Sequence, residues 1–423
     1  MRGGRATAAT VGVVAAVAGL VGPAAAAQTA PGTDPVRAQE YWLEDYGIRQ
    51  AWQTTRGEGT RIAIVDTGVG RAPEFAGVVG GTDVSGRGSP DGRTPVGGVD
   101  ADHGSWVASL AASRGLPGDT GMIGVAPGAE ILSVSVGLGQ DAARPFATQV
   151  AEAVRWSVDA GADIINLSFT TNTLEWDTTW DDAFEYAFSR DVVVIVAAGN
   201  RGSGTAAVGA PATIPGVLTV AGVDPRGAAS VEASTQGITI GVAAPSEDLI
   251  GVSADGGLVL WNGTSGAAPI VAGVAALVRS AHPGLDAANV IERIIRTARP
   301  PAGVSAPDPL YGYGLVDAAA AVTADVAAVS ANPMGDLTEW IRIHRRADAA
   351  PAPDAVPAAP VPALPPAEAA RTPVSPLLPT SATVLFGTVP LLAGTLAAIL
   401  VALGVTAAVR RIRLASANRG PSR

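Results

Sequence analysis

The sequence has 423 residues, of which 48% are hydrophobic and only 16% are charged, and its net charge is −10. That length allows one large domain or two ordinary ones. The acidic balance argues against nucleic acid as a partner. The sequence contains no cysteine, which excludes disulfides, thiolate metal sites and a cysteine nucleophile.

The N-terminal segment has the layout of a secretory signal peptide. Arg2 and Arg5 precede an apolar run that ends in small residues, with cleavage expected after Ala27. A retained membrane anchor is the alternative interpretation. We therefore expect a signal peptide at residues 1–27 and a short N-terminal extension at residues 28–40.

Residues 41–330 alternate short β-branched runs with helical patterns. The expected strands lie within 61–68, 130–137, 162–169, 191–200, 217–224 and 238–245, and helical patterns cover 147–162 and 180–190. Nearly continuous apolar strands separated by helices indicate a parallel sheet covered on both faces. The sequence thus predicts a three-layer α/β domain with a mainly parallel central sheet. Functional residues in such sheets gather at the carboxyl ends of the strands.

Two residues in the first part of this domain are candidates for proton transfer. Asp66 closes the strand "RIAIVD", where a carboxylate requires a polar or cationic partner. His103, in "DADHGSWVASL", begins an apolar helical pattern, and histidine exchanges protons near neutral pH. A strand-end cap for Asp66 is the structural alternative. The other two histidines, His282 and His344, are interpreted as surface residues.

Ser265 lies in "NGTSGAAPIVAGVAAL", at the start of a long apolar helical pattern. A helix N-cap is one interpretation. A serine hydroxyl becomes a nucleophile when a histidine removes its proton and a carboxylate orients that histidine. Asp66, His103 and Ser265 provide these three roles, in the chain order of the subtilisin triad.

The segments "AIVDTGV", "DHGSWVASL" and "NGTSGAAPIVAGVAAL" resemble the Asp, His and Ser motifs of the subtilisin-like serine proteases, or subtilases. The resemblance covers about residues 41–322 and implies the subtilisin-like fold and serine endopeptidase activity. It also implies that Asn200, in "VVVIVAAGN", contributes its amide to the oxyanion hole, together with the backbone N–H of Ser265.

The same resemblance makes Ser168, Phe169 and Thr170 one wall of the substrate-binding region. Thr170 stands where secreted subtilisins have a glycine, so we expect narrower substrate binding. After the serine, the family usually has a larger residue than Gly266. We expect this glycine to leave space behind the nucleophile and to loosen the first helical turn.

Many subtilases bind structural calcium, but this sequence gives no indication of it. The loop before His103 contains Asp83, Asp91, Asp100 and Asp102 without EF-hand spacing. We interpret it as a solvated acidic loop and expect no metal site and no required cofactor.

The C-terminal part predicts a membrane anchor. Residues 331–383 form a linker rich in proline and alanine, which favours an extended spacer. Residues 384–409 are uncharged and long enough to cross a bilayer, and the arginine-rich tail at 410–423 follows. The positive-inside rule places this tail in the cytoplasm and the body outside the plasma membrane.

This layout resembles the mycosins, membrane-anchored subtilases associated with type VII secretion in actinobacteria. The resemblance implies limited cleavage of protein or peptide substrates and a secretion complex of the plasma membrane as a partner. Two alternatives stay open: a structural component of that complex with dispensable proteolysis, and a general surface protease. Mycosins commonly contain cysteines, and this sequence differs from them because it has none.

Overall fold

The computed structural model describes residues 34–98, 100–138, 143–345 and 389–417. Its residues divide into two units, 1–350 and 351–423, which are described separately. The predicted signal peptide at 1–27 lies outside the described residues. So do the first part of the extension, most of the linker and the end of the basic tail.

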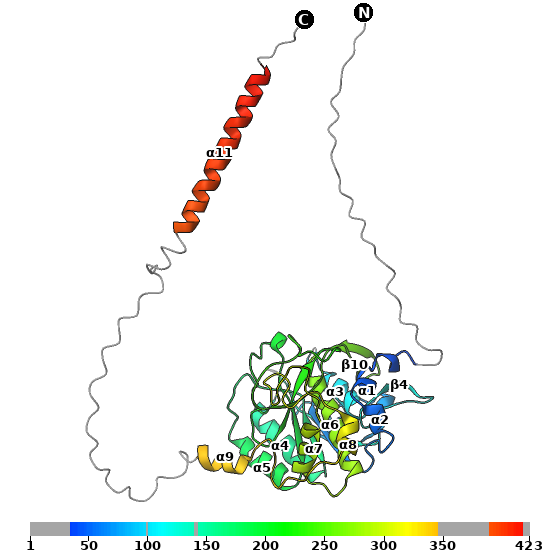
Figure 1. The fold of residues 1–423 in the computed structure, drawn as a ribbon. Helices are drawn as coiled ribbons and strands as arrows, with labels where there is room; N and C mark the ends of the chain where they lie inside the picture. Colours follow the sequence, from blue (N-terminus) through cyan, green and yellow to red (C-terminus); the bar gives the residue numbers. More distant parts are fainter. Residues whose placement is uncertain (1–33, 99, 139–142, 346–388, 418–423) are drawn as a thin grey trace, which may run out of the picture. The chain divides into compact units, whose positions relative to one another are not determined.

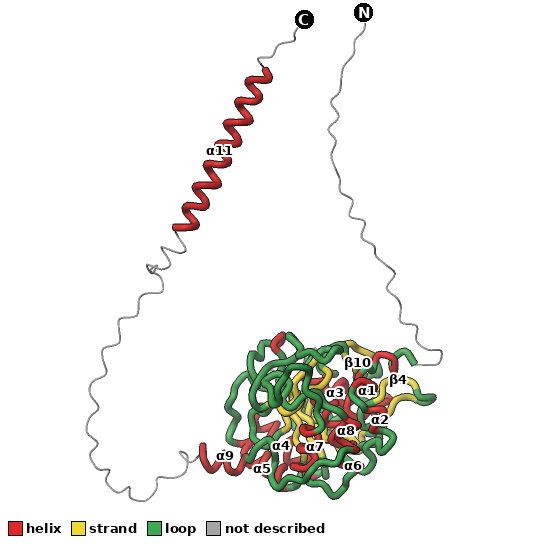
Figure 2. Tube along the Cα trace, in the orientation of Figure 1, coloured by secondary structure: helices red, strands yellow, loops and turns green. Residues whose placement is uncertain are grey.

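The first unit is built on a sheet of seven parallel strands (Figures 1 and 2). Its order is β2-β5-β1-β6-β7-β8-β9. The strands are β1 (Arg61–Asp66), β2 (Val78–Asp83), β5 (Glu130–Ser135), β6 (Ile164–Leu167), β7 (Val193–Ala197), β8 (Leu218–Val223) and β9 (Ile240–Pro245). Strand order reverses beside β1, because β5 lies on one side of it and β6 on the other.

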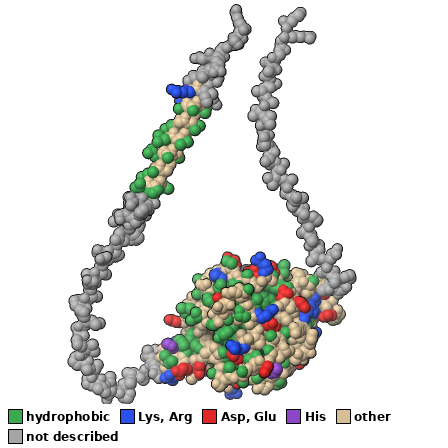
Figure 3. Space-filling model, viewed as in Figure 1, with side chains coloured by type: hydrophobic (Ala, Val, Ile, Leu, Met, Phe, Trp, Pro, Cys, Tyr) green, Lys and Arg blue, Asp and Glu red, His purple; other side chains and the backbone are tan. Residues whose placement is uncertain are grey.

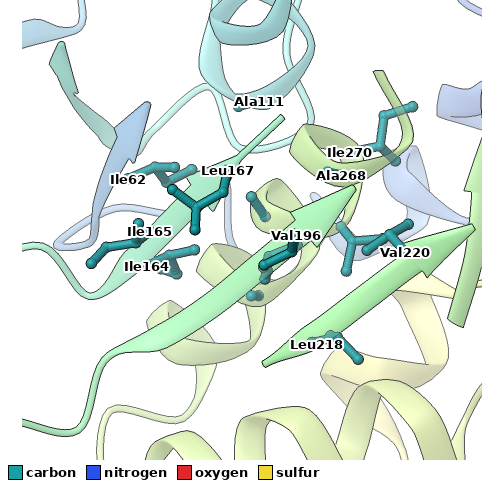
Figure 4. Packing of buried hydrophobic residues seen from close by; sticks show 14 of the residues in the cluster. Ile62, Ala111, Ile164, Ile165, Leu167, Val196, Leu218, Val220, Ala268 and Ile270 are labelled. Atoms are coloured by element: carbon teal, nitrogen blue, oxygen red, sulfur yellow. The ribbon is translucent and has the colours of Figure 1, made fainter. Parts of the chain in front are cut away.

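The central strands are buried on both faces. Every residue of β6, β7, β8 and β9 is buried, and in β1 only Arg61 is exposed. Figure 4 shows buried side chains of β6, β7 and β8, among them Ile164, Leu167 and Val196, which belong to the same hydrophobic core as Ile270 of a helix. The apolar runs of the sequence therefore form strands because a parallel sheet between helix layers buries both of their faces.

Helices cover the sheet as two packed pairs. The pair α3 (His103–Ala112) and α6 (Thr264–Ala281) forms one layer, and the pair α4 (Phe146–Asp159) and α5 (Thr179–Ser189) forms the other. α6 contacts β1, β6, β7, β8 and β9, and 78% of it is buried. This arrangement confirms the three-layer subtilisin-like fold.

Shorter elements complete the unit. They are η1 (Arg37–Gln39), α1 (Trp42–Asp45), α2 (Ile48–Ala51), η2 (Pro73–Phe75), η3 (Arg201–Ser203), α7 (Ala287–Arg296), α8 (Ala318–Thr323) and α9 (Leu337–His344). Two antiparallel hairpins pair β3 (Arg114–Leu116) with β4 (Thr120–Ile123) and β10 (Leu249–Val252) with β11 (Leu258–Trp261).

The folded body extends beyond the boundary expected at residue 330. Asp336 caps α9 by accepting a hydrogen bond from Glu339 N, and Leu337 is buried. Trp340 packs against Trp176, with ring centroids 4.4 Å apart, so α9 is attached to the body. The prediction of a linker beginning at 331 is therefore wrong up to Arg345, because a helix with one apolar side packs on α5 there.

The second unit contains α11 (Val389–Ala417). Its segment Val389–Arg411 is a candidate membrane span of 23 residues with a mean hydropathy of 2.3, and no part of it is buried. Hydrophobic side chains cover it until Arg410 and Arg411 (Figure 3). The buried helix α6 has similar length and apolar character, but it lies in the core of the first unit.

Candidate active site

Three of the predicted site residues lie at the carboxyl ends of neighbouring strands. Asp66 is the last residue of β1, Ser168 directly follows β6, and Asn200 comes shortly after β7. These strands are adjacent in the order β1-β6-β7, so their ends share one edge of the sheet. The reversal of strand order beside β1 is the position at which such sheets form a ligand-binding crevice.

Asp66 and His103 form a direct hydrogen bond. His103 Nδ1 lies 2.8 Å from Asp66 Oδ1, and the same oxygen accepts the backbone N–H of Thr67 at 2.7 Å. Asp66 is fully buried, whereas the His103 side chain is 16% exposed. A carboxylate can only accept, so Nδ1 donates and Nε2 of the neutral ring remains available as a base.

The start of α3 is fitted closely to the end of β1, which positions His103. Thr67 Oγ1 accepts the backbone N–H of Gly104 at 2.8 Å. A Cβ at Gly104 would lie 2.5 Å from the carbonyl oxygen of Gly68, so a side chain there would push the helix away. Glycine at this position allows the backbone contact that holds His103 over Asp66.

The environment of His103 favours its protonated form. Burial by itself lowers the pKa of the ring, but the charge of Asp66, its hydrogen bond and the charge of Asp100 outweigh burial and raise the pKa above its usual value. The ring therefore accepts a proton readily.

Ser265 is the second residue of α6. Its backbone N–H therefore has no acceptor within the helix and points out of the positive N-terminal end. The Ser265 hydroxyl donates to the carbonyl oxygen of Ser168 at 2.9 Å. In this structure the hydroxyl is thus directed at the Ser168 carbonyl.

A second hydrogen bond joins Ser168 and Ser265, and Pro269 explains why it forms. Proline has no N–H, so it cannot donate to the carbonyl of Ser265 four residues earlier. That carbonyl instead accepts the Ser168 hydroxyl at 2.9 Å, and Ser168 Oγ itself accepts from Asn166 Nδ2 at 2.9 Å. A buried network from β6 therefore holds the first turn of α6.

The Asn200 side chain is oriented by the residue before the serine. Asn200 Oδ1 accepts from both the backbone N–H and the hydroxyl of Thr264, at 2.8 and 2.9 Å. With the amide oxygen occupied, Nδ2 is the group left to donate to a ligand. Thr264, which no sequence argument singled out, thus fixes the donor that an oxyanion requires.

A cavity of about 250 Å³ adjoins Ser265. Its lining includes Ser168, Phe169, Thr170, Asn200 and Ser265. Phe169 is 9% exposed and packs edge-on against Phe146. Thr170 turns its hydroxyl to the carbonyl of Gly209 at 3.0 Å. The three predicted wall residues therefore lie on one cavity, together with the serine and the asparagine.

The space expected behind the nucleophile is absent. Gly266 is buried, and a Cβ there would lie 2.2 Å from Leu249 Cδ1 and 3.2 Å from Leu110 Cδ1. The expectation of space behind Ser265 was wrong because Leu249 of β10 fills the volume that a larger residue would occupy. The expectation of a loosened first turn stays a prediction. A contact between residues so distant in sequence leaves no local signal.

Two tryptophans adjoin the histidine and were missed by the sequence analysis. The His103 ring centroid lies 5.7 Å from that of Trp261 and 6.2 Å from that of Trp106, both edge-on. Trp106 Nε1 donates to Ser253 Oγ at 3.0 Å, which fixes its ring. The indoles therefore pack against the imidazole and restrict its movement.

The acidic loop offers no assembled cation site in the part that the structure describes, where no group of three or more acidic or histidine side chains could hold a metal. The Asp83 carboxylate accepts backbone N–H groups of Ser85 and Gly88, and Asp91 pairs with Arg71. His282 bonds to the carbonyl of Val322, and His344 is exposed on α9.

With this geometry established, comparison with known proteins identifies the class. The model of the subtilase family, Peptidase S8, matches residues 57–314. The chain belongs to the subtilase family, whose members are serine endopeptidases.

Within that family, the chain is similar to the mycosins. It is 35% identical to mycosin-3 of Mycobacterium tuberculosis over 352 residues, which cover 69% of this chain and 73% of that protein. Its structure is similar to that of the MycP3 protease from the type VII (ESX-3) secretion system, with 32% identity and a TM-score of 0.58 over 71% of this chain and 90% of that one. A chain in the periplasmic assembly from the ESX-5 inner membrane complex is 29% identical, with a TM-score of 0.58 over 79% of this chain and 92% of that one.

Proposed function

We propose that this subtilase is a membrane-anchored serine endopeptidase that acts outside the plasma membrane, in limited proteolysis linked to type VII secretion. Its catalytic triad is Asp66, His103 and Ser265. The observation that carries this proposal is the 2.8 Å hydrogen bond between His103 and Asp66. Ser168 connects this pair to the serine, because it lines both the cavity beside His103 and the cavity that contains Ser265. Similarity to the mycosins supports the link to secretion.

In this mechanism, the Ser265 hydroxyl breaks its hydrogen bond to the Ser168 carbonyl and transfers its proton to His103 Nε2. Ser265 Oγ then attacks the carbonyl carbon of the scissile peptide bond. Asp66 stabilises the imidazolium, which then protonates the leaving amine. Asn200 Nδ2 and the backbone N–H of Ser265 donate to the oxyanion at the N-terminus of α6. Loss of such an asparagine lowers the rate about 10²–10³-fold, a magnitude measured in a subtilisin.

A fluorophosphonate probe tests the nucleophile directly, because it phosphonylates an activated serine. We expect the full-length protein to be labelled, the Ser265→Ala variant to be unlabelled, and a Ser280→Ala variant at the opposite end of α6 to keep its label. Failure to label the wild-type protein beside a labelled control subtilase, or labelling of Ser265→Ala, contradicts the triad.

A structural role in a secretion complex is the second candidate, and the similarity to a chain of the ESX-5 assembly favours it. Replacing the chromosomal gene with Ser265→Ala separates the two roles. If secretion continues in this strain but stops when the whole gene is deleted, the folded body is required apart from proteolysis. Broad cleavage of denatured casein by the wild-type protein would instead indicate a general surface protease.

A further inference from the structure

A second cavity of about 320 Å³ adjoins the one that contains Ser265. It is lined by Asn200, Gly202, Ser203, Glu232, Ala233, Glu247 and Asn262. Asn200 and Ser203 line both cavities. A peptide whose carbonyl oxygen binds Asn200 therefore has access to both cavities.

The lining residues indicate which part of the substrate enters the second cavity. The wall formed by Ser168, Phe169 and Thr170 belongs to the first cavity and not to the second. The first cavity accommodates the residue that supplies the attacked carbonyl, since this wall contacts Ser265 directly. The second cavity shares Asn200 and Ser203 with the first but lacks this wall, so we assign it to residues that follow the scissile bond.

The second cavity is acidic and contains no arginine. The exposed Glu232 has its carboxylate against Gly202, where a Cβ would lie 2.9 Å from Glu232 Oε2. The half-buried Glu247 carboxylate accepts the hydroxyl of Ser230. Among the described residues, neither glutamate forms an ion pair.

The neighbouring cations are engaged elsewhere. Arg201 donates to the carbonyls of Ser230 and Ser234, at 3.0 and 3.2 Å, and Arg226 pairs with Asp224 at 2.8 Å. The acidic residue Asp248 directly follows Glu247 and is exposed. In the described part of the chain, neither arginine forms an ion pair with Glu232 or Glu247, so both carboxylates remain available to a cation that enters the cavity.

We propose that Glu232 and Glu247 make this cavity a binding site for a cationic side chain, arginine or lysine, on one of the first residues after the scissile bond. This inference rests on the proposed peptidase function. It assigns a charge preference to the leaving-group side of the substrate, which neither the triad nor the wall at 168–170 determines.

The test uses a peptide library and pairs of quenched peptides that differ only by arginine or glutamine at each of the three positions after the cleaved bond. We expect the wild-type protein to prefer arginine by about 3- to 10-fold in kcat/KM at one of these positions, because partly solvated charge pairs contribute modestly. The preference should weaken as salt is raised. The double variant Glu232→Gln/Glu247→Gln should lose it.

Two controls keep the result interpretable. Glu185→Gln on α5 changes the net charge outside the cavity and should keep the preference. The rate of fluorophosphonate labelling should stay unchanged in the double variant, because the probe reacts with Ser265 without a peptide in the second cavity. Normal labelling of the wild-type protein without a preference for arginine after the bond, or a preference that the double variant retains, overturns the inference. Absence of labelling in the wild-type protein contradicts the proposed function instead.

Discussion

His103 receives its orientation and its raised pKa from Asp66, through one hydrogen bond and one buried charge. Asp66→Asn removes the charge and changes the group facing Nδ1, so we expect kcat to fall about 10⁴-fold, as in other serine-protease triads. A general base must be neutral, so kcat/KM of the wild-type protein should rise with pH as the His103 ring loses its proton. Without the aspartate charge, burial lowers the pKa of the ring, and the acidic limb should move to lower pH.

The pH dependence of kcat/KM for both proteins checks this prediction. Asp102→Asn, which changes an acidic residue next to His103 in sequence but outside the hydrogen bond with Asp66, serves as the control and should keep most of the activity. An acidic limb at the same pH in Asp66→Asn and in the wild-type protein would show that Asp66 does not set the pKa of His103.

Gly266 and Leu249 share one volume behind the proposed nucleophile. Gly266→Ala should destabilise the protein by about 1–3 kcal/mol, because Leu249 is fully buried and must shift to admit even a methyl group. Leu249→Ala alone should cost about 2–5 kcal/mol by opening a cavity. Gly266→Met combined with Leu249→Ala should cost less than the two single changes together, because the methionine fills that cavity.

Urea unfolding of the wild-type protein, Gly266→Met, Leu249→Ala and the double variant that combines these two changes measures the coupling. Gly273→Ala on the same helix provides the comparison, since its Cβ would lie 2.5 Å from Val125 Cβ and Leu249 plays no part there. If Leu249→Ala rescues Gly273→Ala as well as it rescues the Gly266 variants, the shared volume is not the cause.

Arg345, at the end of helix α9, contributes to the attachment of this helix to the body. Arg345 donates to the Asp181 carboxylate at 2.9 and 3.2 Å, and its guanidinium lies over the rings of Trp176 and Trp340. Arg345→Ala removes a half-buried ion pair and both ring contacts, which should cost about 1–2 kcal/mol of local stability. Amide hydrogen exchange in α9 should accelerate about 10-fold, whereas exchange in β7 should not change.

Arg342→Ala is the matched control on the same helix, because Arg342 pairs within α9, with Glu339. This variant should leave the attachment to α5 intact. Equal acceleration of α9 exchange by both substitutions would mean that helix propensity, not the contact with Asp181, holds α9 in place.

The segment before α1 is anchored by a buried glutamate. Glu40 Oε1 accepts the N–H of Ile123 at 2.8 Å, and burial raises the pKa of this carboxyl to about 8 although Ile123, Arg37 and Arg49 lower it. Arg37 Nε lies 3.7 Å from Glu40 Oε2, but the Arg37 N–H groups donate to the carbonyls of Thr120 and Gly121. The ion pair therefore does not offset the effect of burial on the pKa of Glu40. The native state therefore holds a proton on Glu40 near neutral pH.

A carboxyl whose pKa is higher in the folded than in the unfolded state stabilises the fold most at low pH. This contribution is complete below about pH 4.5 and is lost as pH rises toward 8. Glu40→Gln, which keeps an acceptor for Ile123, should flatten the decline in stability over this interval by about 1 kcal/mol or more. Thermal unfolding midpoints at pH 5 and pH 8 measure it. A decline of the same size in Glu40→Gln and wild-type protein would contradict a protonated Glu40.

At the scale of the whole molecule, the apolar segment of α11 is a candidate membrane span, and the proposed location of the protease depends on it. Its 23 residues give a helix of about 34 Å, enough to cross a hydrocarbon core of about 30 Å. We expect the full-length protein to stay in the membrane pellet after alkaline carbonate extraction. A variant ending at residue 383 should be released and still react with the fluorophosphonate.

A variant ending at Arg411 controls for the loss of the tail and should stay in the pellet, because the span is complete. Release of the full-length protein by carbonate would contradict a membrane-spanning anchor. Loss of labelling in the variant ending at 383 would instead indicate that the first unit depends on the anchor for its folding.

The amino-acid sequence determined the features that depend on local pattern. Apolar runs of strand length separated by amphipathic helices require a covered parallel sheet, and a strand ending in Asp66 places a carboxylate at its carboxyl edge. The motifs around His103 and Ser265 carry the family resemblance within a few residues each. An uncharged segment of membrane length is likewise a property of composition, readable without any tertiary contact.

Only the tertiary structure decided the features that depend on residues far apart in the chain. Leu249 fills the space beside Gly266, Trp261 and Trp106 meet over His103, and Glu232 joins Glu247 at a cavity beside Asn200. Helix α9 was assigned to the linker because the residues that hold it on the body, Asp181 and Trp176, lie more than 150 positions earlier. Packing and charge compensation arise between elements, so a pattern along one element cannot reveal them.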